Sequence, residues 1–225
     1  MATRLTAVVI QACDPKSLSE FWTSLLGADA VAGSGGVALV FVPTPSPKGG
    51  KNRVHLDLKS GPEQLERVLG LGARPADIGQ GSVDWEVLAD PEGNEFCLQP
   101  GLSQGIEWTA ICQDAADPAA QARFWGAAAG LRAVRSGDWG VAMAMTVAAA
   151  TATVSSDVEA TAPLLVMGPP VAPKQGPNRL GLALTPGQGS DPAVEASRLV
   201  AEGAVREDGV LLDPEGNEFW IGWGE

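Results

Sequence analysis

Apolar and polar residues alternate along RVHLDLKS, residues 53–60. In an extended strand the apolar residues of this segment lie on one face, and His55 and Asp57 lie on the other. The apolar, β-branched segment LTAVVIQA, residues 5–12, is also typical of a strand. In NEFCLQ, residues 94–99, Phe96 and Leu98 alternate with polar or small residues. The pattern therefore predicts strands with one buried face and one chemically distinct face.

Helical spacing of apolar residues follows Asp14. Asp14 is expected to cap the helix, Pro15 to occupy its first turn, and Gly27 to end it. A second helix is predicted within residues 61–75. The predicted buried positions are Leu18, Phe21, Trp22, Leu25 and Leu26 in the first helix and Leu65, Val68, Leu69 and Leu71 in the second.

Three motifs occur twice, in the same order. The offset between copies rises from 103 at the helix motif to 126 at the following loop. The second copy thus holds 23 more residues there, either because it carries an inserted hairpin or because the first copy is shortened. We predict two homologous domains, 1–101 and 102–225, joined at the turn-rich QPGLSQG. The pairs are DPKSLSEFW with DPAAQARFW, PKGGKNRVHLDL with PKQGPNRLGLAL, and DPEGNEF at 90–96 with DPEGNEF at 213–219.

The composition and net charge of the chain argue against some classes of binding partner. The chain of 225 residues has a formal net charge of -12 and a pI near 4.5, which argues against nucleic-acid and anionic-membrane partners. The sequence has no signal-peptide pattern, and its three cysteines form no C-x-x-C pair. We therefore expect a soluble, cytoplasmic protein.

The nested βαβββ order, with FWTSLLG, KNRVHLDL and LADPEGNEFCL, resembles the vicinal oxygen chelate superfamily, and more narrowly its glyoxalase-like and bleomycin-resistance-like domains. The resemblance implies an α+β fold. Two tandem domains would each pair βαβββ modules into a curled sheet, with helices outside and a ligand in the concave cup. This fold hosts metal-dependent lyases, isomerases and dioxygenases as well as metal-free binding proteins.

Strand alternation sorts the residues that would face the two cups. The repeated turn is expected to be structural, and function is expected to differ in the residues after it. The first half would place His55, Asp57, Glu95 and Cys97 around one cup, with Trp85 beside them. The second half would line its cup with Trp108, Cys112, Asp114, Glu218 and Trp220.

The resemblance also implies four metal-ligand positions per domain, usually His, Gln or Glu. Among these positions only His55 carries a usual ligand, and neither second-strand position is polar. We therefore expect no metal cofactor, although a divalent site rebuilt from His55, Asp57, Glu95 and Cys97 stays open. The other matching positions are Ala7 and Cys97 in the first half, and Ala110, Gly181 and Trp220 in the second.

These features favour a metal-independent binding protein that holds a small hydrophobic or aromatic, even cationic, ligand in the cup of the second half. That half contains five of the seven tryptophans and a formal charge of -8. The alternative is a lyase- or isomerase-type enzyme that uses His55 with Asp57 or Glu95, with or without a divalent metal. A scaffold with both cups filled by side chains, and a homodimer, are also left open.

Overall fold

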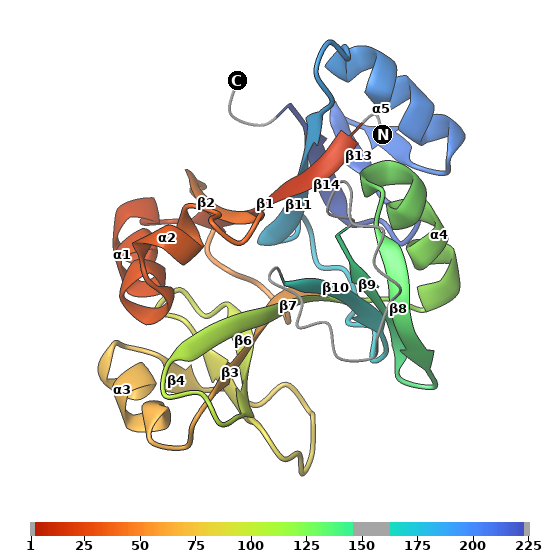
Figure 1. The fold of residues 1–225 in the computed structure, drawn as a ribbon. Coiled ribbons are helices and arrows are strands. Elements are labelled where there is room, and N and C mark those ends of the chain that lie inside the picture. Colours follow the sequence, from red (N-terminus) through yellow and green to blue (C-terminus); the bar gives the residue numbers. More distant parts are fainter. Residues whose placement is uncertain (1–2, 146–162, 223–225) are drawn as a thin grey trace.

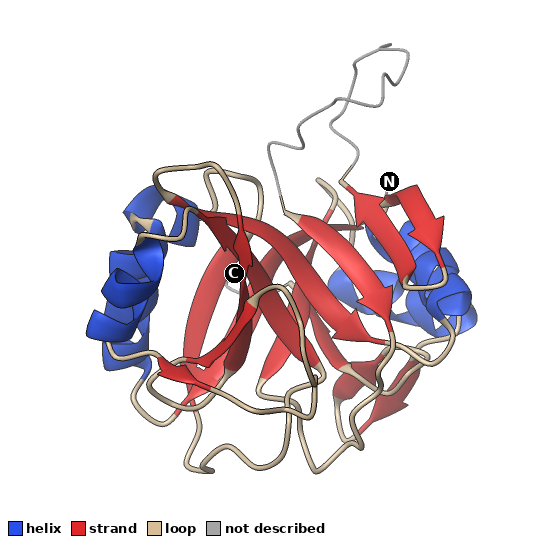
Figure 2. Ribbon diagram, turned by 90° about the horizontal axis from the view of Figure 1, so that it is seen from below, coloured by secondary structure: helices blue, strands red, loops and turns tan. Residues whose placement is uncertain are grey.

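The computed structural model describes residues 3–145 and 163–222. Five helices lie on two opposite sides of the described fold, and the strands lie between them (Figures 1 and 2). The helices are α1 (Pro15–Leu26), α2 (Ala28–Val31), α3 (Gln64–Gly70), α4 (Pro118–Ala129) and α5 (Pro192–Ala201). The strands of the first half are β1 (Thr3–Ala12), β2 (Ala38–Pro43), β3 (Val54–Ser60), β4 (Arg74–Pro75), β5 (Glu86–Ala89) and β6 (Glu95–Pro100). Those of the second half are β7 (Ile106–Asp114), β8 (Arg132–Gly137), β9 (Gly140–Ala144), β10 (Leu164–Gly168), β11 (Leu180–Pro186), β12 (Val205–Glu207), β13 (Val210–Leu212) and β14 (Glu218–Ile221).

Each of the two sheets is shared between the halves of the chain. The six-stranded sheet has the order β12-β13-β14-β11-β1-β2, and the eight-stranded sheet has the order β4-β5-β6-β3-β7-β10-β9-β8. The halves meet where β1 pairs antiparallel with β11 and where β3 pairs antiparallel with β7. Consequently, the first module of the first half completes its sheet with the last module of the second half, and the two middle modules form the other sheet.

The first helix follows the sequence prediction. Asp14 caps α1 by accepting a hydrogen bond from the Ser17 backbone N–H, and Gly27 follows its last residue. Asp117 caps α4 in the same way. The prediction for α3 is wrong at one position, because Leu69 is 36 % exposed and Val68 is the residue that this short helix buries.

The apolar face of β3 is buried as predicted: Val54, Leu56 and Leu58 are at most 1 % exposed. They belong to one hydrophobic cluster that lies under the helices of both sheets. In each half a helix tryptophan packs edge-on against the phenylalanine of the DPEGNEF motif, Trp22 against Phe96 at 5.3 Å between ring centroids and its repeat equivalent at 5.5 Å. Such contacts stabilise a core beyond the area that they bury.

The hydrogen bonds of the repeated DPEGN turn account for its presence in both halves. Asp90 accepts hydrogen bonds from the indole of Trp22 and from Asn94, and thereby ties the turn to α1. Glu92 accepts hydrogen bonds from the backbone N–H groups of Cys13 and Asp14, at the start of the same helix. The turn is therefore a structural clamp on the helix, as the sequence predicts.

The same turns also connect the two halves. Glu92 of the first half forms an ion pair with Arg179 of the second. Glu215 of the second half forms an ion pair with Arg53 of the first, with 3.6 Å between Arg53 Nη2 and a carboxylate oxygen of Glu215. Because these contacts are reciprocal, losing one copy of the motif would loosen both halves.

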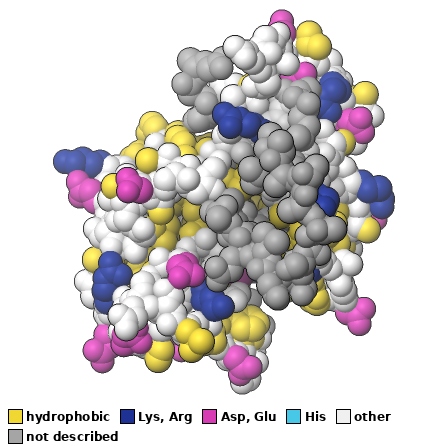
Figure 3. Space-filling view, viewed as in Figure 1, with side chains coloured by type: hydrophobic (Ala, Val, Ile, Leu, Met, Phe, Trp, Pro, Cys, Tyr) yellow, Lys and Arg dark blue, Asp and Glu magenta, His cyan; other side chains and the backbone are white. Residues whose placement is uncertain are grey.

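The second half contains a β8–β9 hairpin, whereas among the described residues no strand pairs with the outer edge of β2. This hairpin lies within the stretch where the second copy has its 23 extra residues. No helix among the described residues is long and apolar enough to cross a membrane. On the face in Figure 3, charged side chains lie mostly at the periphery, with basic ones scattered among acidic ones.

Candidate functional site

The concave face of the eight-stranded sheet collects His55, Asp57, Cys97 and Cys112. His55 lies opposite Cys112 on β7, and Asp57 lies beside Cys97 on β6. Laterally paired residues point to the same face of a sheet, so the four side chains share one surface. Cys112 comes from the second half of the chain, whereas the other three come from the first.

His55 and Asp57 form a dyad on this face. His55 Nε2 lies 3.4 Å from Asp57 Oδ1, and the Gln99 amide donates a 2.7 Å hydrogen bond to Asp57 Oδ2. Asp57 Oδ1 is buried and has no hydrogen-bond partner. Its nearest donors are His55 Nε2 and the Cys97 and Cys112 thiols, which replace the lost water only in part, and incomplete replacement is costly for a buried carboxylate oxygen. The dyad therefore offers one strong acceptor to a bound group.

Both cysteines beside the dyad are held as thiols. Burial, together with the negative charge of Asp57, raises the pKa of Cys97 to about 12. Burial and the same carboxylate raise the pKa of Cys112 well above its ordinary value. Neither cysteine is therefore a thiolate nucleophile at neutral pH, since nucleophilic cysteines have lowered pKa values.

We expect iodoacetamide to label one cysteine per native chain. Cys13 is exposed, whereas Cys97 is buried and Cys112 is half-buried, and the last two remain protonated even at pH 9. Mass spectrometry should show one adduct in the native protein and three after unfolding. Two or more adducts, formed as fast as the Cys13 adduct, would contradict the buried-thiol arrangement.

Three predicted site carboxylates are ion-paired away from the dyad. Glu95 accepts hydrogen bonds from Lys48 Nζ at 2.7 Å and from the Asn52 backbone N–H, so its grouping with His55 and Asp57 is corrected. Each of these carboxylates holds a lysine of a PK loop, which suits anchoring of the loop. The other two pairs are Asp114 with Lys51 at 2.9 Å and Glu218 with Lys174 at 2.7 Å.

The predicted pairing of Trp108 with Trp220 in one cup is wrong. Trp108 lies in the eight-stranded sheet and Trp220 in the six-stranded sheet. An irregularity in the β3–β7 register also places Trp108 opposite Leu58, on the helix side, where it packs against the core. The repeat carried this signal, because Leu5 occupies the equivalent position in the first half and is 3 % exposed.

The concave face of the six-stranded sheet is apolar. Trp220 packs there against Ala7, Val9 and Ala183, all of which are buried. A Cβ atom at Gly181 would lie 2.6 Å from the Trp220 ring, so the ring lies directly over that glycine. Trp220 thus fills the space that the small residues leave.

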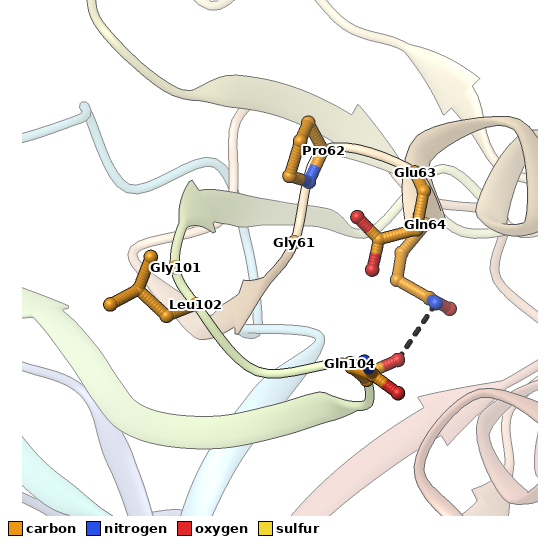
Figure 4. Close-up of a pocket in the computed structure, with 7 residues that line it drawn as sticks. All are labelled: Gly61, Pro62, Glu63, Gln64, Gly101, Leu102 and Gln104. Carbon is orange, nitrogen blue, oxygen red and sulfur yellow. Dashed lines mark hydrogen bonds between the residues drawn. The ribbon is translucent and has the colours of Figure 1, made fainter.

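Trp85 lies at the edge of the eight-stranded cup. Its side chain is near enough to Cys97 to act on the thiol, and the residue is 40 % exposed. The structure places these two side chains next to each other, while their role in ligand binding stays a prediction. A separate hollow of about 460 Å³ lies at the join of the halves, between residues 61–64 and 101–104 (Figure 4). It contains none of the predicted site residues.

The sequence comparison identifies the family. The family model described as "Glyoxalase-like domain" matches residues 7–99 and 110–222. The chain belongs to the glyoxalase-like domain family. The two matches fall one in each half of the chain, while the domain limits 1–101 and 102–225 stay predictions. No curated protein matches the chain at a significant level.

Solved structures share the glyoxalase-like fold. Glyoxalase I from Zea mays is 13 % identical, with 97 % of this chain and 91 % of that chain covered and a TM-score of 0.56. A "putative dioxygenase" from Bacillus subtilis is 10 % identical, with 98 % and 84 % covered and a TM-score of 0.59. At these identities the likeness shows the fold alone. It confirms the predicted α+β class with curled sheets.

Three side chains of the eight-stranded cup offer ligand atoms for a metal ion. One potential ligand atom each from His55, Asp57 and Cys97 lies within 4.8 Å of the other two. Nitrogen, oxygen and sulfur ligands suit a zinc-type divalent ion, and the unpaired Asp57 Oδ1 would gain a partner. Against this, removing the Cys97 proton at pH 7 costs about 7 kcal/mol. The residues fit a metal, at the cost of one thiol proton.

Sequence reasoning missed two members of this site. Cys112 was assigned to the cup of the second half, because nothing local shows that β7 pairs with β3. Gln99 is the second, since its amide donates the hydrogen bond that holds Asp57 in place. Internal repeats show that modules pair, but they do not show which modules pair.

Proposed function

We propose that this glyoxalase-like protein binds a small molecule in the cup of the eight-stranded sheet, with the His55–Asp57 dyad as its polar anchor. The observation that carries the proposal is the buried Asp57 Oδ1, which has no hydrogen bond of good geometry, beside His55 Nε2. Buried polar groups without a partner are rare in folded proteins, and ligand sites are among the reasons for them.

The surroundings of the dyad favour an apolar ligand that carries a hydrogen-bond donor. Val87 lies opposite Cys97, and Val166 lies beside Cys112, so apolar side chains flank the dyad on this face. Trp85 adds an aromatic surface at the edge. Asp57 supplies a negative charge that would pair with an amine or another N–H group. A flat aromatic amine matches this combination.

Planar aromatic amines should therefore quench the tryptophan fluorescence saturably, and Asp57→Asn should weaken their binding by about 10- to 150-fold. That range corresponds to one hydrogen bond to a charged group, worth about 1.5–3 kcal/mol. Asparagine keeps an oxygen for Gln99, so the fold should be retained. Trp220→Ala is the matched control, because its side chain belongs to the other cup.

The opposite result would move the site. If Trp220→Ala abolished binding and Asp57→Asn left it unchanged, the apolar six-stranded cup would be the binding site. Neutral carbocyclic analogues of the same amines serve as a second control. They should bind the wild type more weakly than the amines do, and Asp57→Asn should not change their affinity.

A second candidate function is metal-assisted lyase or isomerase chemistry in the same cup. The observation in its favour is the convergence of His55, Asp57 and Cys97 within 4.8 Å. A divalent ion held by these residues would polarise a substrate carbonyl or enolate oxygen. Gln99 would keep Asp57 in place through its hydrogen bond. Partners, including a second copy of the chain, remain predictions.

A further inference from the structure

The two copies of the PK loop meet and enclose a small cavity. Its lining consists of residues 49–53 from the first half and 173–179 from the second, and its volume is about 30 Å³. The loops are in direct contact, since a Cβ atom on Gly50 would lie 2.7 Å from the side chain of Gln175. Ligand pockets for organic molecules are about ten times larger, so the cavity suits one small ion or a water molecule.

The charged side chains that line the cavity are all basic: Lys51, Arg53, Lys174 and Arg179. Their carboxylate partners are Asp114, Glu215, Glu218 and Glu92, and none of these lines the cavity. Four basic side chains therefore meet at one small space, and each is ion-paired with a carboxylate outside the lining. An anion in this space would face only basic side chains, because no carboxylate lines it.

Two donors in this lining lack acceptors. Arg53 is 5 % exposed and Arg179 is 8 % exposed, and in each the Nε atom is buried without a hydrogen-bond partner. The terminal nitrogens of both guanidinium groups are used, by Glu215 and by Ser46 and Glu92. Arginine carries five donors and no acceptor, so an orphan Nε–H needs an electron-rich atom. Arg53 and Arg179 occupy equivalent positions of the repeat, so each half contributes one unsatisfied Nε–H donor.

We propose that the cavity between the PK loops is a binding site for a small inorganic oxyanion of the phosphate or sulfate class. The anion bridges the two halves by accepting hydrogen bonds from donors of both loops. Arginine is suited to this task because its planar donors match oxyanion geometry. A water molecule in the same place has two acceptor lone pairs, whereas an oxyanion has several acceptor oxygens and can reach the donors of both loops at once.

Lys51 links this site to the eight-stranded cup. It lines the cavity, pairs with Asp114, and its charge acts on Cys97. An anion bound here would hold the Lys51 loop at the edge of that cup. The site is independent of the proposed ligand, because it requires neither His55 nor Asp57.

The test is thermal unfolding of the full chain in inorganic phosphate, with sodium chloride exchanged to keep the ionic strength constant. The wild type should show a saturable rise in Tm of about 3 °C or more. Gln175→Glu should abolish the rise, because it places a negative charge at the cavity. Gln175 is exposed and has no hydrogen bond among the described residues, so this isosteric change should leave the fold intact.

Gln188→Glu is the matched control, with the same change of charge on an exposed residue outside the cavity. It should keep the full phosphate effect. An equal, non-saturating rise in all three proteins would overturn the proposal, because it would be the general stabilisation that excluded salts produce. Absence of any rise in the wild type up to about 50 mM phosphate would overturn it as well.

Discussion

Replacing Asp213 with alanine should lower the free energy of unfolding by about 3–5 kcal/mol, the largest stability effect that we expect. Asp213 is 1 % exposed, and its carboxylate accepts hydrogen bonds from Gln113, Gln121 and Asn217. Without it, several buried donors lose their acceptor, and each such loss costs about 1–3 kcal/mol. Urea unfolding followed by circular dichroism would measure the effect.

Asp84→Ala is the control for this experiment, because Asp84 is exposed and no hydrogen bond to its side chain is found among the described residues. Its loss should be within about 0.5 kcal/mol. A loss below about 1 kcal/mol for Asp213→Ala would contradict the assigned network. Such a result would mean that the donors find water or other acceptors.

The contribution of Asp213 to the free energy of unfolding should also depend on pH. Burial raises the pKa of Asp213 above the value of 3.8 expected for an unperturbed aspartate. The native state therefore binds the proton more tightly than the unfolded state, and the favourable contribution of this group is lost as pH rises through the folded pKa. Asp213→Asn cannot titrate, so the stability of the wild type relative to this variant should fall as pH rises from about 4.

If the protein carries out metal-assisted chemistry, its affinity for zinc should rise about tenfold per pH unit between pH 6 and 9. Binding through Cys97 releases one proton from a thiol whose pKa is about 12, and each unit of pH makes that release easier by one factor of ten. Cys97→Ser and His55→Ala should each reduce the affinity by more than about 100-fold, the upper end of the cost of outer-shell changes. Competition with a chromogenic chelator would report the dissociation constants.

Cys13→Ser is the matched control for the zinc experiment, since Cys13 is exposed and lies outside the cluster. It should leave the affinity unchanged. A pH-independent affinity in the wild type would exclude Cys97 as a ligand, and absence of binding at pH 9 would remove the metal-assisted candidate. The small-molecule proposal would then stand on Asp57 and His55 alone.

Local sequence patterns predicted most of the fold and part of the candidate site. The alternation in RVHLDLKS was sufficient to place Leu56 in the core and His55 with Asp57 on the opposite face. The Asp-Pro pair before the first helix was sufficient to locate its start. These predictions held because they depend on periods of two or 3.6 residues and on capping within four residues.

Contacts between distant residues were not predictable in the same way. Glu95 has the right parity for the cup, but Lys48, 47 positions away, takes its carboxylate. Trp108 has the right parity as well, until one extra residue in β7 reverses its face. Parity from sequence assumes an uninterrupted strand, and a bulge breaks that assumption.

The sequence by itself therefore determined the glyoxalase-like modules, their fourfold repetition, the buried faces of their strands, and the presence of His55 and Asp57 on the strand face opposite the apolar core. Only the tertiary structure decided that the middle modules form one sheet and the outer modules the other, which brings Cys112 to His55 and separates Trp108 from Trp220. The physical reason is that homologous modules present similar edges. Which edges pair depends on the linkers and on ion pairs such as Arg179–Glu92, which form between residues far apart in the chain.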